Sequence, residues 1–164
     1  MRYLLTCIDL FSKRAWAVPI RTKSGRDVTE AFETIANERQ PNLVQSDKGM
    51  EFLNSTFRSM LRRRGIKFYT SENEDLKASV VERFNRTLKT KLYRYFTYVN
   101  TRRYVDVLDD LLHSYNNTYH RSIRMAPVEV GPHNEDVVRM RLYPLKPKSS
   151  VSYTHLTLPT IYSV

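Results

Sequence analysis

Two linked features constrain most what this chain can fold into. One is a short apolar run that leads into an aspartate, and the other is a basic amphipathic helix further along, with a glutamate near its start. The run covers residues 43–46 and leads directly into Asp47. Glu82 stands near the start of a helical pattern that begins at about residue 77. One acidic side chain at the tip of a strand and another on a cationic helix can together hold a hard divalent cation beside a phosphate.

The helical pattern separates its charged side chains from its apolar side. Positions 81, 84, 88, 92 and 95 are apolar or aromatic and repeat at the spacing of one helix face. Glu82, Arg86 and Lys89 follow one another at spacings of four and three residues and share a different face. The sequence therefore predicts one carboxylate and two cations side by side on the open face of this helix.

Apolar runs and helical patterns alternate along the rest of the chain, which predicts an α/β domain. Ser24 and Asn54 each precede a helical pattern and are suited to cap it. The predicted elements, in chain order, are strands at 3–10 and 15–20 joined by a hairpin turn, a helix from 24, a strand at 43–46, a helix from 54 to 65, a strand at 66–70, and helices from 77 and 105.

The formal net charge of +10 favours a polyanionic partner, because the positive side chains cluster. Residues 83–105 contain seven Lys or Arg and no Asp or Glu. A generally solvated basic surface is the alternative, and the clustering favours nucleic acid over it. A single cysteine, Cys7, excludes an internal disulfide framework and favours a reducing compartment. We therefore expect an intracellular protein.

Several motifs resemble the catalytic core of the retroviral-type DDE integrases, and most closely the integrases of Maverick/Polinton DNA transposons. The resemblance covers residues 2–145 in order and implies a ribonuclease H-like fold, in which helices flank a mixed sheet. It also implies DNA as the partner, a homo-oligomer and action in the nucleus. The motifs are Asp-Lys-Gly-x-Glu-Phe at 47–52, Val-Val-Glu-Arg-Phe-Asn-Arg-Thr-Leu-Lys at 80–89, Ile-Asp-Leu-Phe-Ser-Lys at 8–13, Ser-Tyr-Asn-Asn-Thr-Tyr-His at 114–120 and Met-Ala-Pro-Val-Glu-Val at 125–130.

The resemblance further implies metal-dependent DNA strand transfer, in which carboxylates hold two Mg²⁺ (or Mn²⁺) ions. Asp47 matches the family's second acidic ligand and Glu82 its third. We assign Arg86 and Lys89 to contacts with DNA phosphates, with solvated helix charges as the alternative. Lys48 is equally suited to such a contact or to solvent.

The family's first acidic ligand has no match in this chain. Asp9 ends an apolar run, but residues 8–13 match the family's second strand and the turn that follows it. We therefore expect a ribonuclease H-like fold that lacks its first strand and exposes unpaired sheet edges. Two carboxylates in place of three predict an incomplete metal site and a catalytically inactive chain.

Three segments follow from this interpretation. Residues 1–130 form a partial integrase catalytic core, and residues 131–149 form a charged connector with little periodicity. Residues 150–164 resemble the translation of an adaptor used in transposase-based sequencing libraries, so we expect them to be disordered or non-native. An ordinary β-prone C-terminal segment is the alternative.

Two other functions would use the same residues. A non-catalytic nucleic-acid-binding module derived from an integrase would keep the fold and the basic face, and the missing carboxylate favours it. A ribonuclease H-type hydrolase would share the carboxylates, and cleavage of RNA–DNA hybrids would separate it from strand transfer. We interpret His120 as a structural histidine, and the acidic stretch 71–75 as a solvated loop in preference to metal ligands.

Overall fold

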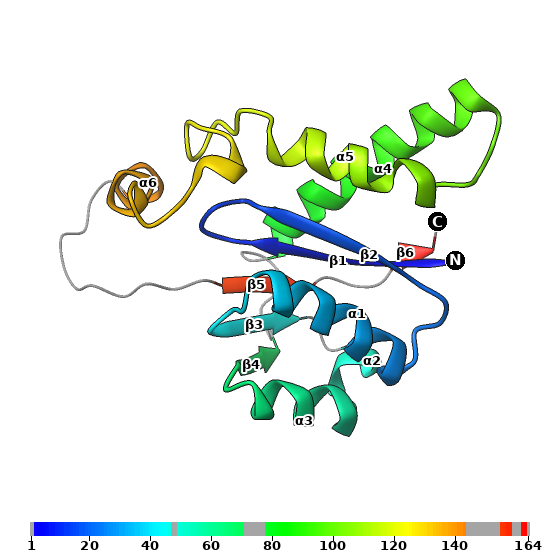
Figure 1. Ribbon diagram of the computed structural model, residues 1–164, viewed down its shortest axis with the longest axis horizontal. Coiled ribbons are helices and arrows are strands. Elements are labelled where there is room, and N and C mark those ends of the chain that lie inside the picture. The colour runs from blue at the N-terminus through cyan, green and yellow to red at the C-terminus, as the bar shows by residue number, and fades with distance from the viewer. Residues whose placement is uncertain (1, 47–48, 71–77, 144–154, 159–161, 164) are drawn as a thin grey trace.

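A mixed sheet with helices on both faces forms the body of this computed structural model (Figure 1). The structure describes residues 2–46, 49–70, 78–143, 155–158 and 162–163. The strands lie in the order β2–β1–β5–β3–β4, and β6 pairs with β1. The elements are β1 (Tyr3–Asp9), β2 (Ala15–Ile20), α1 (Gly25–Glu38), β3 (Leu43–Ser46), α2 (Met50–Leu53), α3 (Ser55–Arg63), β4 (Lys67–Thr70), α4 (Ala78–Val99), α5 (Val105–Asn116), η1 (Pro127–Glu129), α6 (Glu135–Leu142), β5 (His155–Leu158) and β6 (Tyr162–Ser163).

Strands β1 and β2 form the predicted hairpin. They pair antiparallel from Tyr3 opposite Ile20 to Ile8 opposite Ala15. In the turn, the amide of Lys13 donates to the carbonyl of Asp9, and Lys13 adopts a positive φ of 62°. Strands β3 and β4 pair parallel, as expected for strands joined by helices on one face of a sheet.

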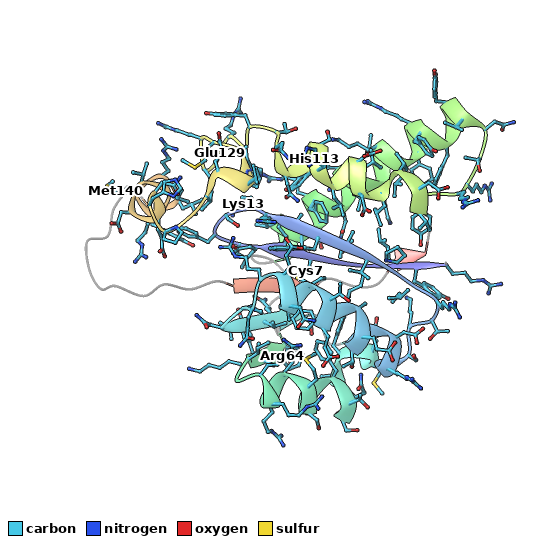
Figure 2. The ribbon with its side chains drawn as sticks, viewed as in Figure 1. Cys7, Lys13, Arg64, His113, Glu129 and Met140 are labelled. Atoms are coloured by element: carbon cyan, nitrogen blue, oxygen red, sulfur yellow. The ribbon has the colours of Figure 1, made fainter. Side chains whose placement is uncertain are left out.

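The alternation of side chains along β1 divides the core into two layers. Leu5 and Cys7 pack with α1, α2 and α3 on one face, whereas Leu4 and Ile8 pack with α4 and α5 on the other. Figure 1 shows the two helical layers on opposite sides of the sheet. Cys7 lies inside the first layer, where burial raises the pKa of its thiol (Figure 2).

Local signals set the ends of the first helices as predicted. The Ser24 hydroxyl accepts from the amide of Asp27 at the start of α1, and the Asn54 amide oxygen accepts from the amide of Phe57 at the start of α3. Gly65 follows α3 with a φ of 68°, a conformation that favours glycine. No helix in the described residues is long and apolar enough to cross a membrane.

Helix α6 lies within the segment that the sequence predicts to be an irregular connector. Val138 on α6 is buried and forms a small core with Ile123 and Val130. Arg141, in the last turn, donates to the carbonyl of Ile123. The sequence interpretation missed this helix because its eight residues present a single fully buried side chain, too few for a periodic signal.

Two short strands of the C-terminal segment, residues 155–158 and 162–163, lie in the sheet, and the expectation that residues 150–164 are disordered or non-native stays a prediction. Strand β5 lies between β1 and β3, antiparallel to β1 and parallel to β3. The expected unpaired edges of β1 and β3 are therefore covered where β5 runs. The physical reason is that open strand edges present unpaired N–H and C=O groups, and a β-prone segment of the same chain can pair with both.

Breaking the β5 ladder should lower the stability of the chain. Thr157 pairs with Ile8 of β1 and Gln45 of β3, and proline at this position removes the backbone donor. We expect Thr157→Pro to lower the free energy of unfolding by about 1–3 kcal/mol, measured by urea unfolding. Ser152→Pro, outside β5, is the control. Equal stability of the two variants would show that β5 does not hold the sheet together.

Candidate nucleic-acid and metal site on helix α4

Strand β3 leads to the first predicted ligand. Ser46, its last residue, is buried and pairs with Thr70 of β4. Asp47 and Lys48 come next in the chain but lie outside the described residues, so their geometry is not tested. Helix α2 follows and places Phe52 in the core, where the ring packs edge-on against Phe57. Strand β3 thus precedes the Asp-Lys-Gly-x-Glu-Phe motif, and Phe52, the last residue of the motif, is anchored in the core.

Glu82 lies exposed on α4, the helix on the other face of the sheet. Val81, Phe84, Leu88 and Leu92 are buried as predicted, and Tyr95 is partly buried. The Phe84 ring lies edge-on to Tyr115 of α5, with ring centroids 4.9 Å apart. This packing fixes the rotation of α4 and leaves Glu82 and Arg86 exposed, with Lys89 half-buried.

Asn85 stands beside Glu82 and is a residue to which the sequence interpretation gave no role. Its side chain is 4% exposed, and neither its oxygen nor its nitrogen has a hydrogen-bond partner in the part of the chain that the structure describes. Buried amides are normally satisfied. The sequence does contain a signal for this buried amide, because Asn85 is a polar residue beside the apolar positions of the helix. Helix α4 therefore carries one buried amide that the described residues leave without a partner.

The carboxylate of Asp9 forms hydrogen bonds and an ion pair inside the fold. Asp9 is fully buried, and its carboxylate accepts from the amide of Phe11 at 3.0 Å and the hydroxyl of Ser12 at 2.7 Å. The Arg39 guanidinium lies 3.4 Å from its second oxygen. These donors stabilise the hairpin turn. The geometry agrees with the exclusion of Asp9 as a metal ligand.

Within residues 2–46, 49–70 and 78–143, no group of three His, Cys, Asp or Glu side chains could hold a metal ion. Glu82 is thus the one predicted ligand whose surroundings the structure shows. Its carboxylate is exposed and has hard oxygen donors, which suit Mg²⁺ or Mn²⁺.

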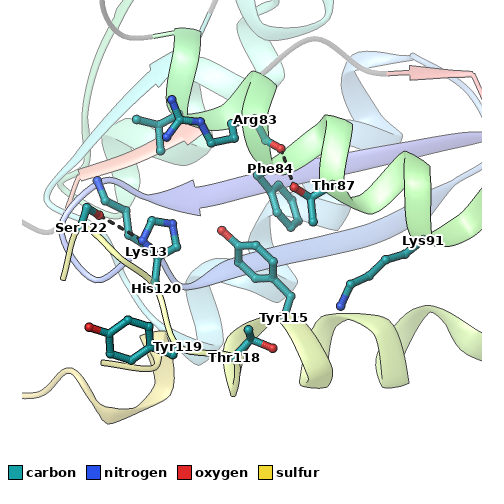
Figure 3. Close-up of a pocket in the computed structure, with 11 residues that line it drawn as sticks. Lys13, Arg83, Phe84, Thr87, Lys91, Tyr115, Thr118, Tyr119, His120 and Ser122 are labelled. Atoms are coloured by element: carbon teal, nitrogen blue, oxygen red, sulfur yellow. Dashed lines mark hydrogen bonds between the residues drawn. The ribbon is translucent and has the colours of Figure 1, made fainter. Parts of the chain in front are cut away.

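A second polar cluster lies across α4 from Glu82. Arg83, on α4, stands near Lys13 of the hairpin turn and His120 of the segment after α5 (Figure 3). Burial lowers the pKa of His120, and the positive charges of Lys13 and Arg83 lower it further. Burial raises the pKa of Tyr115 to about 12, with Arg83 opposing the shift. Sequence reasoning missed this cluster because its members are far apart in the chain.

Comparison with known proteins defines the class. Residues 1–75 match the sequence profile of the family described as integrase core domain. The fold resembles the magnesium-bound catalytic core domain of HTLV-2 integrase in its trimeric form, with a TM-score of 0.67 and 19% identity over 78% of this chain and 84% of that one. Residues 1–75 thus resemble integrase core domains in sequence, and the chain shares the fold of the HTLV-2 catalytic core.

The chain is also similar to a transposon-derived protein. The chain is 38% identical over 130 residues to the transposon-derived protein F54H12.3 of Caenorhabditis elegans, covering 78% of this chain and 45% of that protein. It also resembles a chain of the simian T-cell lymphotropic virus intasome bound to the PP2A regulatory subunit B56 gamma, with a TM-score of 0.72 and 19% identity over 92% of this chain and 52% of that one. The chain spans less than half the length of the curated relatives it matches.

The structural role of Asp9 can be tested directly. Asp9→Asn places an amide N–H against donors that need an acceptor, so we expect a loss of about 2 kcal/mol in the free energy of unfolding. Asp106→Asn, which breaks an exposed pair with Arg103, should stay within about 0.5 kcal/mol of wild type. A stable Asp9→Asn chain with weakened Mg²⁺ binding would instead make Asp9 a ligand.

The pKa of His120 is lowered first by burial and then by the charges of Lys13 and Arg83, so removing the Arg83 charge should raise it in part. We expect an NMR titration to give His120 a pKa below the ordinary 6.5, and Arg83→Gln to raise it. Because the folded state disfavours protonation of His120, its contribution to stability is present above pH 6.5 and is lost as the pH falls through the folded pKa. Arg94→Gln, further along α4, is the control. An unchanged His120 titration in Arg83→Gln would exclude this coupling.

Proposed function

We propose that this chain is the catalytic core of a mobile-element integrase, whose parent protein performs metal-dependent transfer of element ends into target DNA in the nucleus. The observation that carries the proposal is the exposed Glu82 carboxylate beside the Arg86 cation, on a helix of an integrase catalytic core fold. The motif at residues 47–52 supports an affiliation with Maverick/Polinton integrases.

Asp47 and Glu82 are the residues that would hold the metal ions. When bound, Mg²⁺ or Mn²⁺ would activate the attacking hydroxyl and stabilise the leaving oxygen of the phosphodiester. Arg86, Lys89 and Lys48 would contact the DNA backbone, position the strand and neutralise its phosphates.

The number of carboxylates in the proposed metal site supports a catalytically inactive chain. Two ions close together need at least three carboxylates, and the proposed set has two. Asp9 has the right chemistry, but its oxygens already accept from Phe11 and Ser12, and its carboxylate forms an ion pair with Arg39. We infer that this polypeptide binds DNA and one metal ion weakly, and does not catalyse strand transfer. The same observation favours the alternative, a non-catalytic nucleic-acid-binding module of integrase descent.

The similar structures support the proposed metal and assembly. The HTLV-2 catalytic core is a magnesium complex in a trimeric form, and the simian T-cell lymphotropic virus protein is part of an intasome. We extend both properties to the parent of this chain. Joining two DNA ends to one target requires more than one protomer, so a homo-oligomer follows from the proposed reaction.

Strand-transfer assays on the purified 164-residue chain test the catalytic part. We expect no joined product with Mg²⁺ or Mn²⁺, because the proposed ligand set has two carboxylates. In calorimetric titration, Glu82→Gln should weaken Mn²⁺ binding, whereas Glu33→Gln on α1 should not. Robust strand transfer that depends on Glu82 would refute inactivity and keep the integrase assignment. Cleavage of RNA–DNA hybrids without strand transfer would point to a hydrolase.

DNA binding tests the role of the open face of α4. Arg86→Gln removes one phosphate contact, so we expect about 3- to 10-fold weaker binding to duplex DNA at 0.1 M salt and a salt slope smaller by about 1. Arg26→Gln on α1 removes the same charge from the other helical layer and serves as the control. If the two variants lost the same affinity for duplex DNA, net charge and not the α4 face would govern binding.

A further inference from the structure

A pocket of about 350 Å³ lies on the side of α4 opposite Glu82 (Figure 3). Arg83, Thr87 and Lys91, spaced four residues apart, present one edge of the helix to it. The hairpin turn contributes Lys13, and the chain from the end of α5 onward contributes Tyr115 and His120 among others. The volume lies in the range of sites that hold small ligands or a single nucleotide.

Positive side chains line this pocket, with Lys91 at the opposite end from Lys13 and Arg83, where its ammonium donates to the Ser114 hydroxyl at 3.1 Å. Lys13, Arg83 and Lys91 line it together with His120, and no carboxylate does so among the described residues. Asp9 is close enough to raise the pKa of Lys13, but its oxygens accept from Phe11 and Ser12. The described part of the chain offers none of these three cations an ion pair across the pocket.

Lys13 is held in place as a donor. Its side chain is only 8% exposed, and its ammonium donates to the carbonyl of Leu10, which leaves two of its three N–H groups for another acceptor. Burial lowers the pKa of Lys13, and Arg83 lowers it further. An anion in the pocket would relieve the repulsion that Lys13 and Arg83 exert on each other and on His120.

The other groups of the pocket fit a phosphate with an attached nucleoside. The Tyr115 hydroxyl stays protonated because its pKa is raised to about 12, so it is a donor, and Figure 3 shows it pointing into the pocket. The ring of Tyr119 lines one wall and is largely exposed, whereas Phe84 is buried against Tyr115. Aromatic faces of this kind stack on sugars and bases.

We propose that this pocket binds a phosphate monoester, the terminal phosphate of a nucleotide or of a DNA strand. A monoester carries close to two negative charges at neutral pH, which matches the three cations better than the single charge of a backbone diester. The pocket uses neither Asp47 nor Glu82, so the proposal goes beyond the metal-dependent reaction and does not rest on it. In a DNA complex, it would hold a strand end against α4.

Fluorescence anisotropy with two short single-stranded oligonucleotides, identical except for a 5′-phosphate or a 5′-hydroxyl, tests the site. We expect the full chain to bind the phosphorylated strand about tenfold more tightly, because a terminal phosphate adds charge-assisted hydrogen bonds. Arg83→Gln should abolish this preference and Lys91→Gln should reduce it. Arg94→Gln and Glu82→Gln should retain it, which separates failure of this site from failure of the proposed function.

A second measurement keeps the proposal falsifiable if Arg83→Gln fails to fold. Inorganic phosphate, added to the unmodified chain, should raise the pKa of His120 in an NMR titration. If inorganic phosphate displaces the labelled phosphorylated strand as well as the unlabelled strand does, the site is assigned to free phosphate. If only the unlabelled strand displaces it, the site is assigned to strand ends. Equal binding of both oligonucleotides, with no response of His120 to phosphate, would overturn the proposal.

Discussion

Strand β1 is the element on which the rest of the structure depends, because its side chains alternate between two separate cores. Leu5 and Cys7 hold the layer that carries α1 and α3, and Leu4 and Ile8 hold the layer that carries α4 and α5. A shift of one residue in its register would exchange the two sets. The hairpin pairing with β2, closed by the buried Asp9, prevents that shift.

The position of α4 against β1 gives this helix two edges of different chemistry. One edge presents Glu82 and Arg86, where we place metal and DNA backbone, and the other presents Arg83 and Lys91 to the cationic pocket. The buried stripe through Phe84 separates them. One edge therefore carries a carboxylate, and the other carries positive charges alone. The first edge suits a metal cation with its phosphate, and the second suits a free anion.

Asp9 and Glu82 show how burial decides the role of the same chemical group. Both are carboxylates with a favourable sequence context. Asp9 lies in the hairpin turn, where an amide, a hydroxyl and a guanidinium occupy its oxygens, and it stabilises the fold. Glu82 lies exposed on a helix and keeps its oxygens for a ligand. A buried, fully engaged carboxylate cannot be recruited to a metal without breaking the turn.

The sequence by itself determined the local features: the hairpin, the strand before Asp47, the caps Ser24 and Asn54, and the apolar stripe of α4. Each depends on side chains a few residues apart, so periodicity and capping chemistry suffice to predict it. Only the tertiary structure decided the pairing of β5 between β1 and β3, the ion pair of Asp9 with Arg39, and the meeting of Lys13, Arg83 and His120. These contacts join residues distant along the chain, and which of them form depends on how the layers pack around β1, for which no local pattern exists.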